Sequence, residues 1–414
     1  MRLAQGHHLA YCANIHRGET WLEIFAALET YALAVKERVC PSQPYAIGLR
    51  LSAQAAWELA QGRALAEFQH WLARHDCYVF TINGFPFGHF HGRRVKEKVY
   101  LPDWTSPERL DYTNRLFDLL AQLLPPGVEG SVSTVPGSFK EFTTTDQQRQ
   151  AIRDHLFRCV QHLDQRSRES GRTLHLGLEP EPLCLLETTA ETVEFFGRLR
   201  DEHPGEARLE QCLGVNYDTC HLAVEYENPA EALARLRRHQ IKVSKLHLSS
   251  ALKARPTPEA RAALAAFADD VYLHQVVARG ADGALVRYRD LDAALGAAAP
   301  AEEWRVHFHI PLHCPAAEWF EPTTDHLLGV LDVLQAEPGL CAHLEMETYT
   351  WEVMPAAMKS RNVVDQLAAE YDWCLAQLQK RGMGASQPPA PFVSASASSS
   401  AASNEACMEE ASGD

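Results

Sequence analysis

The chain has 414 residues, enough for two or three domains or for one large α/β barrel with insertions. With 46% hydrophobic and 22% charged residues, the composition is that of a globular protein and excludes collagen-like, coiled-coil and fully disordered classes. The 39 basic and 54 acidic residues give a net charge of −15, which argues against non-specific binding to nucleic acid, because that binding needs a basic surface.

Two further features that the sequence lacks limit the expected location of the protein and the expected state of its cysteines. No window of about 18 uncharged apolar residues is present, and the first residues lack the form of a signal peptide, so we expect a cytoplasmic protein without membrane insertion. The eleven cysteines never form a Cys-x-x-Cys pair, which favours reduced, buried thiols over a disulfide framework or a structural zinc site.

Short apolar runs alternate along the chain with longer segments in which apolar residues recur every three to four positions. Helices are predicted at 19–38, 52–75, 106–124, 145–170, 189–203, 229–240 and 360–380, and strands at 9–14, 45–51, 78–83, 131–135, 174–181, 213–218, 242–247, 306–312 and 342–349. This alternation predicts parallel strands with right-handed crossovers. Nine strands exceed the eight positions of a barrel, so one is expected in an insertion between residues 249 and 304.

A closed barrel is favoured over an open sheet by the side chains of the later strands. In the segments 174–181, 245–249, 307–313 and 343–347, polar and apolar residues alternate, so each strand has one polar face, whereas both faces of an open parallel sheet are apolar. We therefore predict an α/β fold, a (β/α)8 TIM barrel over residues 1–383 with an insertion before its last strand. Residues 384–414 form a Ser/Ala-rich acidic segment that is expected to be a disordered tail.

The predicted strand ends carry seven acidic or imidazole side chains: Glu179, Glu181, Asp218, His221, His247, Glu345 and Glu347. Gathered at one barrel mouth, these groups would repel one another unless a cation offset them. A divalent ion is the simplest solution. The excess of carboxylates favours Mn²⁺, and Mg²⁺, Co²⁺ or Zn²⁺ also suits such a ligand set. The pattern leaves open which glutamate of each pair is the ligand.

The segments 178–180, 214–221, 245–248 and 346–348 resemble the glutamate, aspartate, histidine and closing glutamate strands of the xylose isomerase-like TIM barrels. That superfamily holds sugar isomerases, ketose 3-epimerases and endonuclease IV repair enzymes. The resemblance covers about residues 174–347 in the right order. It implies that Glu179, Asp218, His247 and Glu347 hold the metal.

More narrowly, the whole chain resembles the EboE family, the TIM-barrel members of the Ebo metabolite-traffic cluster. The segments 81–88, 309–313 and 347–351 carry this resemblance. It implies a role in making or exporting a small metabolite, with other proteins of that pathway as partners. It does not supply a reaction.

Two departures bear on the reaction. The segment 133–138 resembles the endonuclease segment in which a histidine ligand precedes Pro-Gly-Ser, but here Val135 takes that position. Lys253 stands where ketose epimerases have an arginine that contacts substrate oxygens, and its ammonium is a donor of different geometry.

These observations favour a metal-dependent isomerase or epimerase of a small polyhydroxylated carbonyl compound. Glu179 and Glu347 are expected to take and return the substrate proton. The expected substrate contacts are Glu181, His221, Lys253, Asn83, His309 and Glu345, and the aromatic segment 85–91 is expected to line or cover the pocket. Two alternatives stay open, a metabolite carrier or pathway scaffold without catalysis and an endonuclease IV-like phosphoesterase. Metal content would separate them.

Overall fold

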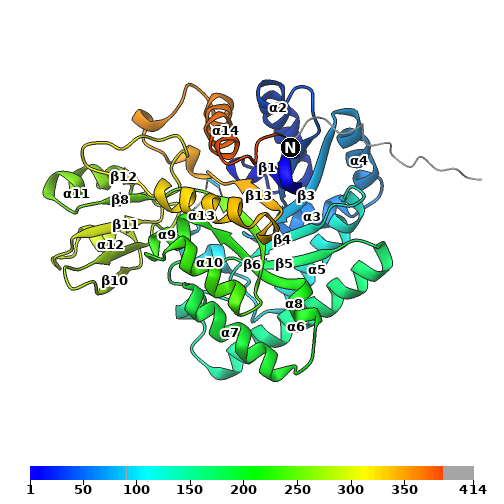
Figure 1. The fold of residues 1–414 in the computed structure, drawn as a ribbon, viewed down its shortest axis with the longest axis horizontal. Coiled ribbons are helices and arrows are strands. Elements are labelled where there is room, and N and C mark those ends of the chain that lie inside the picture. Colours follow the sequence, from blue (N-terminus) through cyan, green and yellow to red (C-terminus); the bar gives the residue numbers. More distant parts are fainter. Residues whose placement is uncertain (90, 93, 386–414) are drawn as a thin grey trace, which may run out of the picture.

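A closed barrel of eight parallel strands forms the centre of the computed structural model, which describes residues 1–89, 91–92 and 94–385 (Figure 1). The hydrogen-bonded order is β1-β13-β7-β6-β5-β4-β3-β2, which confirms the predicted barrel. The strands are β1 (His8–Cys12), β2 (Tyr45–Arg50), β3 (Cys77–Asn83), β4 (Gly130–Thr134), β5 (Leu174–Leu178), β6 (Leu213–Asp218), β7 (Lys242–Leu248) and β13 (His343–Met346).

Helices follow each barrel strand and surround the barrel. They are α1 (Trp21–Ala27), α2 (Leu33–Val39), α3 (Ala53–Leu59), α4 (Ala64–Arg74), α5 (Pro107–Leu123), α6 (Asp146–Ser170), α7 (Thr189–Glu202), α8 (Arg208–Cys212), α9 (Thr219–Val224), α10 (Pro229–Arg238), α13 (Thr324–Ala336) and α14 (Val363–Lys380). Local sequence sets their ends, as α6 illustrates. Thr145 and Gln148 form a capping box at its start, and Gly171 ends it with φ 64°.

The insertion is longer than predicted and runs from Ser249 to Thr323, beyond the expected limit at residue 304. It contains a five-stranded antiparallel sheet of order β10-β9-β11-β8-β12, seen at the left of Figure 1. Its strands are β8 (Leu252–Ala254), β9 (Val276–Arg279), β10 (Leu285–Tyr288), β11 (Glu303–Val306) and β12 (Glu321–Pro322), and its short helices are α11 (Pro258–Leu264) and α12 (Leu291–Leu295). After this sheet, α13 returns to pack against α10 beside the barrel.

The predicted strand 306–312 is the one of the nine that does not join the barrel. Its first residue ends β11, which pairs antiparallel with β8 and β9, and the rest is an extended segment outside any strand. The alternation of the segment is real, but it has another cause. Phe308 and Ile310 belong to an apolar cluster of the insertion, whereas His307 and His309 face the barrel mouth.

The two ends of the described chain meet. The amide of Ala4 donates to the carbonyl of Gly384 (2.8 Å), and Ala385 forms a β-bridge with Leu3, so these two residues of the expected tail pair with the N-terminal segment. The rest of the expected tail, 386–414, lies outside the described residues. Within the described part of the chain, no helix is both long and apolar enough to cross a membrane.

Candidate metal centre

Four side chains from four neighbouring strands of the barrel converge at its C-terminal mouth. They are Glu179, which follows β5, Asp218 at the end of β6, His247 in β7 and Glu347, which follows β13. One ligand atom from each lies within 4.8 Å of the others. The Nδ1 atom of His247 is 3.0 Å from Glu179 Oε1, 3.0 Å from Glu347 Oε2 and 3.5 Å from Asp218 Oδ2. Ligands at about 2.0–2.3 Å from a shared ion stand at such separations from one another.

Asp218 presents one oxygen to this group and uses the other to hold the backbone. Its Oδ1 accepts hydrogen bonds from the amides of Cys220 (2.7 Å) and His221 (3.1 Å) and from Ser249 Oγ (2.6 Å). The two bonds from the amides cap the N-terminus of α9. Its Oδ2 is buried and has no hydrogen-bond partner among the described residues. The contact with His247 Nδ1 at 3.5 Å is too long to satisfy this buried oxygen fully, and a bound cation would do so. The donor set therefore fits a divalent metal.

In the protein alone, a protonated His247 imidazole offsets one of the three carboxylate charges of the group. Burial would lower the pKa of His247, but the carboxylates of Glu347 and Glu179 raise it well above 6.5. Burial would raise the pKa of Asp218, but His221 and His247 hold it well below its usual range. A metal ion would take the place of the proton on His247 Nδ1, so binding of the metal releases a proton.

Glu345 supports His247 from below and does not reach the cavity, contrary to its predicted role in substrate binding. Its Oε2 lies 3.1 Å from His247 Nε2 and accepts from Lys245 Nζ (2.6 Å). Glu345 pairs with His247 in the barrel register, two residues deeper than Glu347, which explains the difference. Burial opposes its ionisation, but Lys245 and His247 lower the pKa of Glu345 to about 2. A carboxylate that accepts from the far nitrogen of a metal-binding histidine fixes the orientation of that ring.

Asn83, also predicted to bind substrate, lies in the same interior layer. Its Nδ2 donates to Glu345 Oε1 (2.9 Å), and its Oδ1 accepts from Lys245 Nζ (2.6 Å). Gly48 of β2 makes room for this arrangement, because a methyl group there would overlap Glu345 Oε1. Glu345, Lys245 and Asn83 thus form a hydrogen-bonded polar network below the metal centre that holds His247 in place.

A cavity opens directly above the four ligands. Its polar floor includes Glu179, Glu347, Glu181, His221 and two residues described below, and its walls are largely apolar or aromatic, among them Phe85, Val99, Tyr272 and Leu273. Phe85 belongs to the aromatic segment that was expected to line the pocket.

Glu181 and His221 reach this cavity, as their predicted roles require. Tyr100 OH donates to Glu181 Oε1 (2.7 Å), and burial raises the pKa of Glu181 to about 7. His221 Nδ1 donates to the carbonyl of Pro180 (3.0 Å), and burial would lower the pKa of His221, but the nearby carboxylates of Asp218 and Glu181 raise it.

Comparison with known proteins agrees with the architecture. No family model and no curated protein matches the chain. A solved xylose isomerase-like TIM barrel protein from Mycobacterium smegmatis, in complex with magnesium, is 14% identical over 92% of this chain and 99% of that chain, with a TM-score of 0.50. The chain has the xylose isomerase-like TIM-barrel fold. L-ribulose 3-epimerase (14% identity, 92% and 96% coverage, TM-score 0.48) and the IOLI protein with a bound zinc atom (14%, 90% and 98%, 0.46) are also similar.

Lys253 lies outside the centre of this xylose isomerase-like barrel, contrary to the prediction. The chain leaves β7 for the insertion before it reaches Lys253, which stands on β8 and pairs in register with β11 and β12. Its ammonium is 3.1 Å from Asp325 Oδ2 and 3.4 Å from Glu321 Oε2. It does not line the cavity.

His309 lies beside the centre without lining the cavity. Its Nδ1 donates to the backbone carbonyl of Glu347 (2.9 Å), and the ring comes close to Asp218 and His221. It therefore borders the ligands from the insertion side and is not among the residues that line the cavity.

Two residues of the cavity floor were missed. Asn14 Nδ2 donates to Glu347 Oε1 (2.6 Å) and so orients that carboxylate, and His307 lies over Glu181 and His221. Asn14 ends the first predicted strand, and a polar residue at a strand end was the available signal. For His307 the signal was its spacing of two residues from His309.

Proposed function

We propose that the protein is a metal-dependent isomerase or epimerase that moves a proton within a small polyhydroxylated metabolite carrying a carbonyl group. The convergence of Glu179, Asp218, His247 and Glu347 beneath a cavity that Glu179 and Glu347 line is the observation that carries this proposal. A bound divalent ion would polarise the carbonyl and its neighbouring hydroxyl and so acidify the intervening C–H bond.

Glu179 and Glu347 are the two groups that would exchange the substrate proton. Both line the cavity, and they come from strands on opposite sides of β6 and β7 in the barrel order, so a substrate bound in the cavity above them would lie within reach of both carboxylates. The hydrogen bond from Asn14 restrains Glu347. Glu181, which lines the same floor, is placed to contact a substrate hydroxyl.

Three carboxylates and one imidazole favour a metal that prefers oxygen ligands. We therefore propose Mn²⁺ as the resident ion, with Mg²⁺, Co²⁺ or Zn²⁺ compatible with the same ligands. The orienting bond from Glu345 to His247 suits any of them.

We also propose that the metabolite belongs to a biosynthesis or traffic pathway of the Ebo type. Two of the three segments that resemble the EboE family line this cavity and the third contacts a residue that lines it, which supports the proposal. Phe85 and Pro86 of the first segment line its wall, His309 of the second contacts Glu347, and Tyr349 of the third lines it as well.

Metal analysis and isotope exchange test the proposed reaction. The purified chain is expected to carry a divalent ion and, with Mn²⁺ in D₂O, to introduce deuterium beside the carbonyl of a substrate found among ketoses and aldoses. Glu347→Gln should abolish the exchange, whereas Glu321→Gln, an exposed position on the insertion, should retain it. A chain that binds such sugars but exchanges no deuterium at full metal occupancy would be a carrier.

A further inference from the structure

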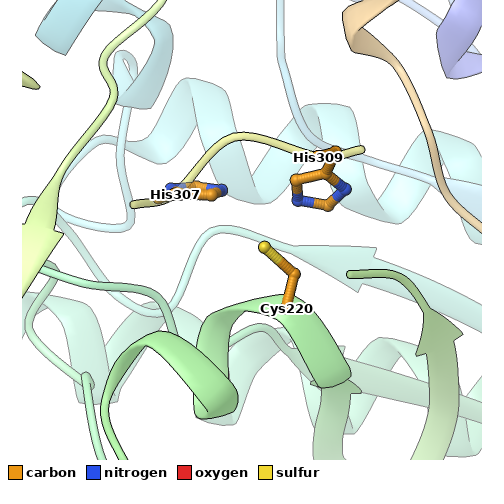
Figure 2. Close-up of side chains that lie close together, drawn as sticks. All are labelled: Cys220, His307 and His309. Carbon is orange, nitrogen blue, oxygen red and sulfur yellow. The ribbon is translucent and has the colours of Figure 1, made fainter. Parts of the chain in front are cut away.

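A second group of potential metal ligands lies beside the first and includes none of its four members. Cys220 Sγ and one ring nitrogen each of His307 and His309 lie within 4.8 Å of one another, and all three residues are buried. Figure 2 shows the Cys220 sulfur directed from α9 toward the two rings. No other cysteine in the described part of the chain meets potential ligands in this way.

Each imidazole is held through its Nδ1 atom, which leaves a lone pair on its Nε2 atom. His307 Nδ1 donates to Gln275 Oε1 (2.8 Å), and His309 Nδ1 donates to the carbonyl of Glu347 (2.9 Å). The Nε2 atoms of both rings are buried and have no hydrogen-bond partner among the described residues. A ring that donates from one nitrogen to an oxygen acceptor and exposes the other as a lone pair is the usual state of a metal-binding histidine.

The acceptor of His307 is itself fixed. Gln275 Nε2 donates to Tyr100 OH (2.9 Å) and to the carbonyl of Pro182 (3.2 Å), so its oxygen is the atom that faces His307. The ring of His307 is therefore oriented by partners outside the cysteine–histidine group.

The thiol is also positioned by its backbone. The Cys220 amide donates to Asp218 Oδ1 (2.7 Å) and to Ser249 Oγ (2.8 Å), which fixes the first turn of α9. On its other side Cys220 packs with Val224, Ala251 and Val277, an apolar surround that excludes water. The Nε2 atoms of His307 and His309 face this thiol away from water. The single S–H of Cys220 cannot donate a hydrogen bond to both of them.

We propose that Cys220, His307 and His309 form a second metal site, which takes a borderline ion such as Zn²⁺ or Co²⁺. One thiolate and two imidazoles form a softer ligand set than three carboxylates and one imidazole, so the two neighbouring sites should prefer different metals. On binding, the Cys220 thiol transfers its proton to solvent and the sulfur bonds to the ion. His307 lines the central cavity, which gives the ion a route of entry.

Cobalt substitution tests this site without reference to activity. A thiolate bound to Co²⁺ gives a sulfur-to-metal charge-transfer band in the near ultraviolet, which oxygen and nitrogen ligands do not give. The chelator-treated full chain is expected to bind about two equivalents of Co²⁺ and to show this band. Cys220→Ala should remove the band and about one equivalent, and His307→Ala should weaken both.

Cys159→Ala is the matched control. Cys159 is as buried as Cys220 but lies in α6, away from any group of potential ligands, so this variant should keep the band and both equivalents. The wild-type result alone is decisive if Cys220→Ala does not fold. Two equivalents without the band would place the second ion on Asp218, His221 and His309 and overturn the proposal. One equivalent without the band would overturn it as well.

Discussion

The two metal-ligand groups of this protein are built in different ways. The group of Glu179, Asp218, His247 and Glu347 comes from the carboxyl ends of barrel strands, whose positions follow from the regular alternation of strand residues. His307 and His309 come from an extended segment of the insertion that belongs to no strand. The regularly placed strand ends of a barrel thus supply one site, and an insertion can add ligands next to it without any change in the barrel.

Replacement of Asp218 with Asn should have the largest effect. It keeps the size and one oxygen for capping α9 but removes the charge from the buried Oδ2, so Mn²⁺ occupancy should fall by more than about 100-fold while the fold persists. Metal analysis after dialysis, with circular dichroism, checks both parts. Asp325→Asn, at an exposed acid paired with Lys253, should keep the wild-type metal content.

The same variant separates the two groups of ligands. Because Asp218 is not part of the cysteine–histidine group, the cobalt charge-transfer band should survive in Asp218→Asn. Full Mn²⁺ occupancy in this variant would show that Asp218 is not a ligand.

Glu370 of α14 contacts both the barrel and the extended segment of the insertion. Its ionisation should therefore make the attachment of the insertion to the barrel depend on pH. Its carboxyl accepts from Thr348 Oγ1 (2.6 Å), just after β13, and from the amide of Leu312 (3.3 Å) at the end of the extended segment. Burial raises the pKa of Glu370 from 4.5 to about 7. Its contribution to stability is therefore complete below pH 4.5 and is lost as the pH rises through about 7.

Urea unfolding at about pH 5 and pH 8 measures this contribution. Between these values the wild type should lose free energy of unfolding of the order of 3 kcal/mol from this one group. Glu370→Gln stays neutral and should show a correspondingly smaller loss. Glu181 and Glu225, whose pKa values are also raised to about 7, contribute in the same way. Part of the decrease in the free energy of unfolding with pH therefore remains in both proteins. Glu194→Gln on α7 should retain the wild-type slope, and an equal slope in Glu370→Gln would contradict the assignment.

The barrel and its strand ends could be predicted because hydrophobic periodicity reports them directly. The eight barrel strands fall at predicted positions, and the predicted helix 145–170 is α6 within one residue. Depth along a strand could not be predicted. Glu345 and Glu347 share a face, and only the register with β7 shows that one lies beneath His247 and the other beside it.

The presence of an insertion before the last barrel strand was predicted, but its antiparallel sheet was not, for a different physical reason. The alternation in 306–312 has the period of a strand, but only Val306 pairs with neighbouring strands, and the segment packs its apolar residues into the core of the insertion. Periodicity gives the face on which a side chain lies and does not name the sheet that it joins. His307 was missed for the same reason, since its place above Glu181 depends on how the insertion folds back.

Glu345→Gln should have a moderate effect confined to the barrel site. The amide can still contact His247 Nε2 but loses the charge that orients and polarises the ring, so affinity for Mn²⁺ should fall roughly 10- to 100-fold. Gly48→Ala displaces the same carboxylate from β2 and should lower the affinity in the same direction. Titration with Mn²⁺ measures both variants. An unchanged affinity in both would show that Glu345 has no influence on the metal.

Lys253→Met should have the smallest effect, and it tests the corrected position of this residue. Were Lys253 a substrate contact, loss of its ammonium would raise KM strongly and leave stability unchanged. On β8 it instead pairs with Asp325 and Glu321, both largely exposed, and such ion pairs contribute less than about 1 kcal/mol. The methionine keeps most of the buried aliphatic chain. We therefore expect a loss of stability of roughly 0.5 kcal/mol, with metal affinity and deuterium exchange unchanged. A large increase in KM without loss of stability would show that the insertion brings Lys253 to the substrate, and that the two regions meet more closely than the structure places them.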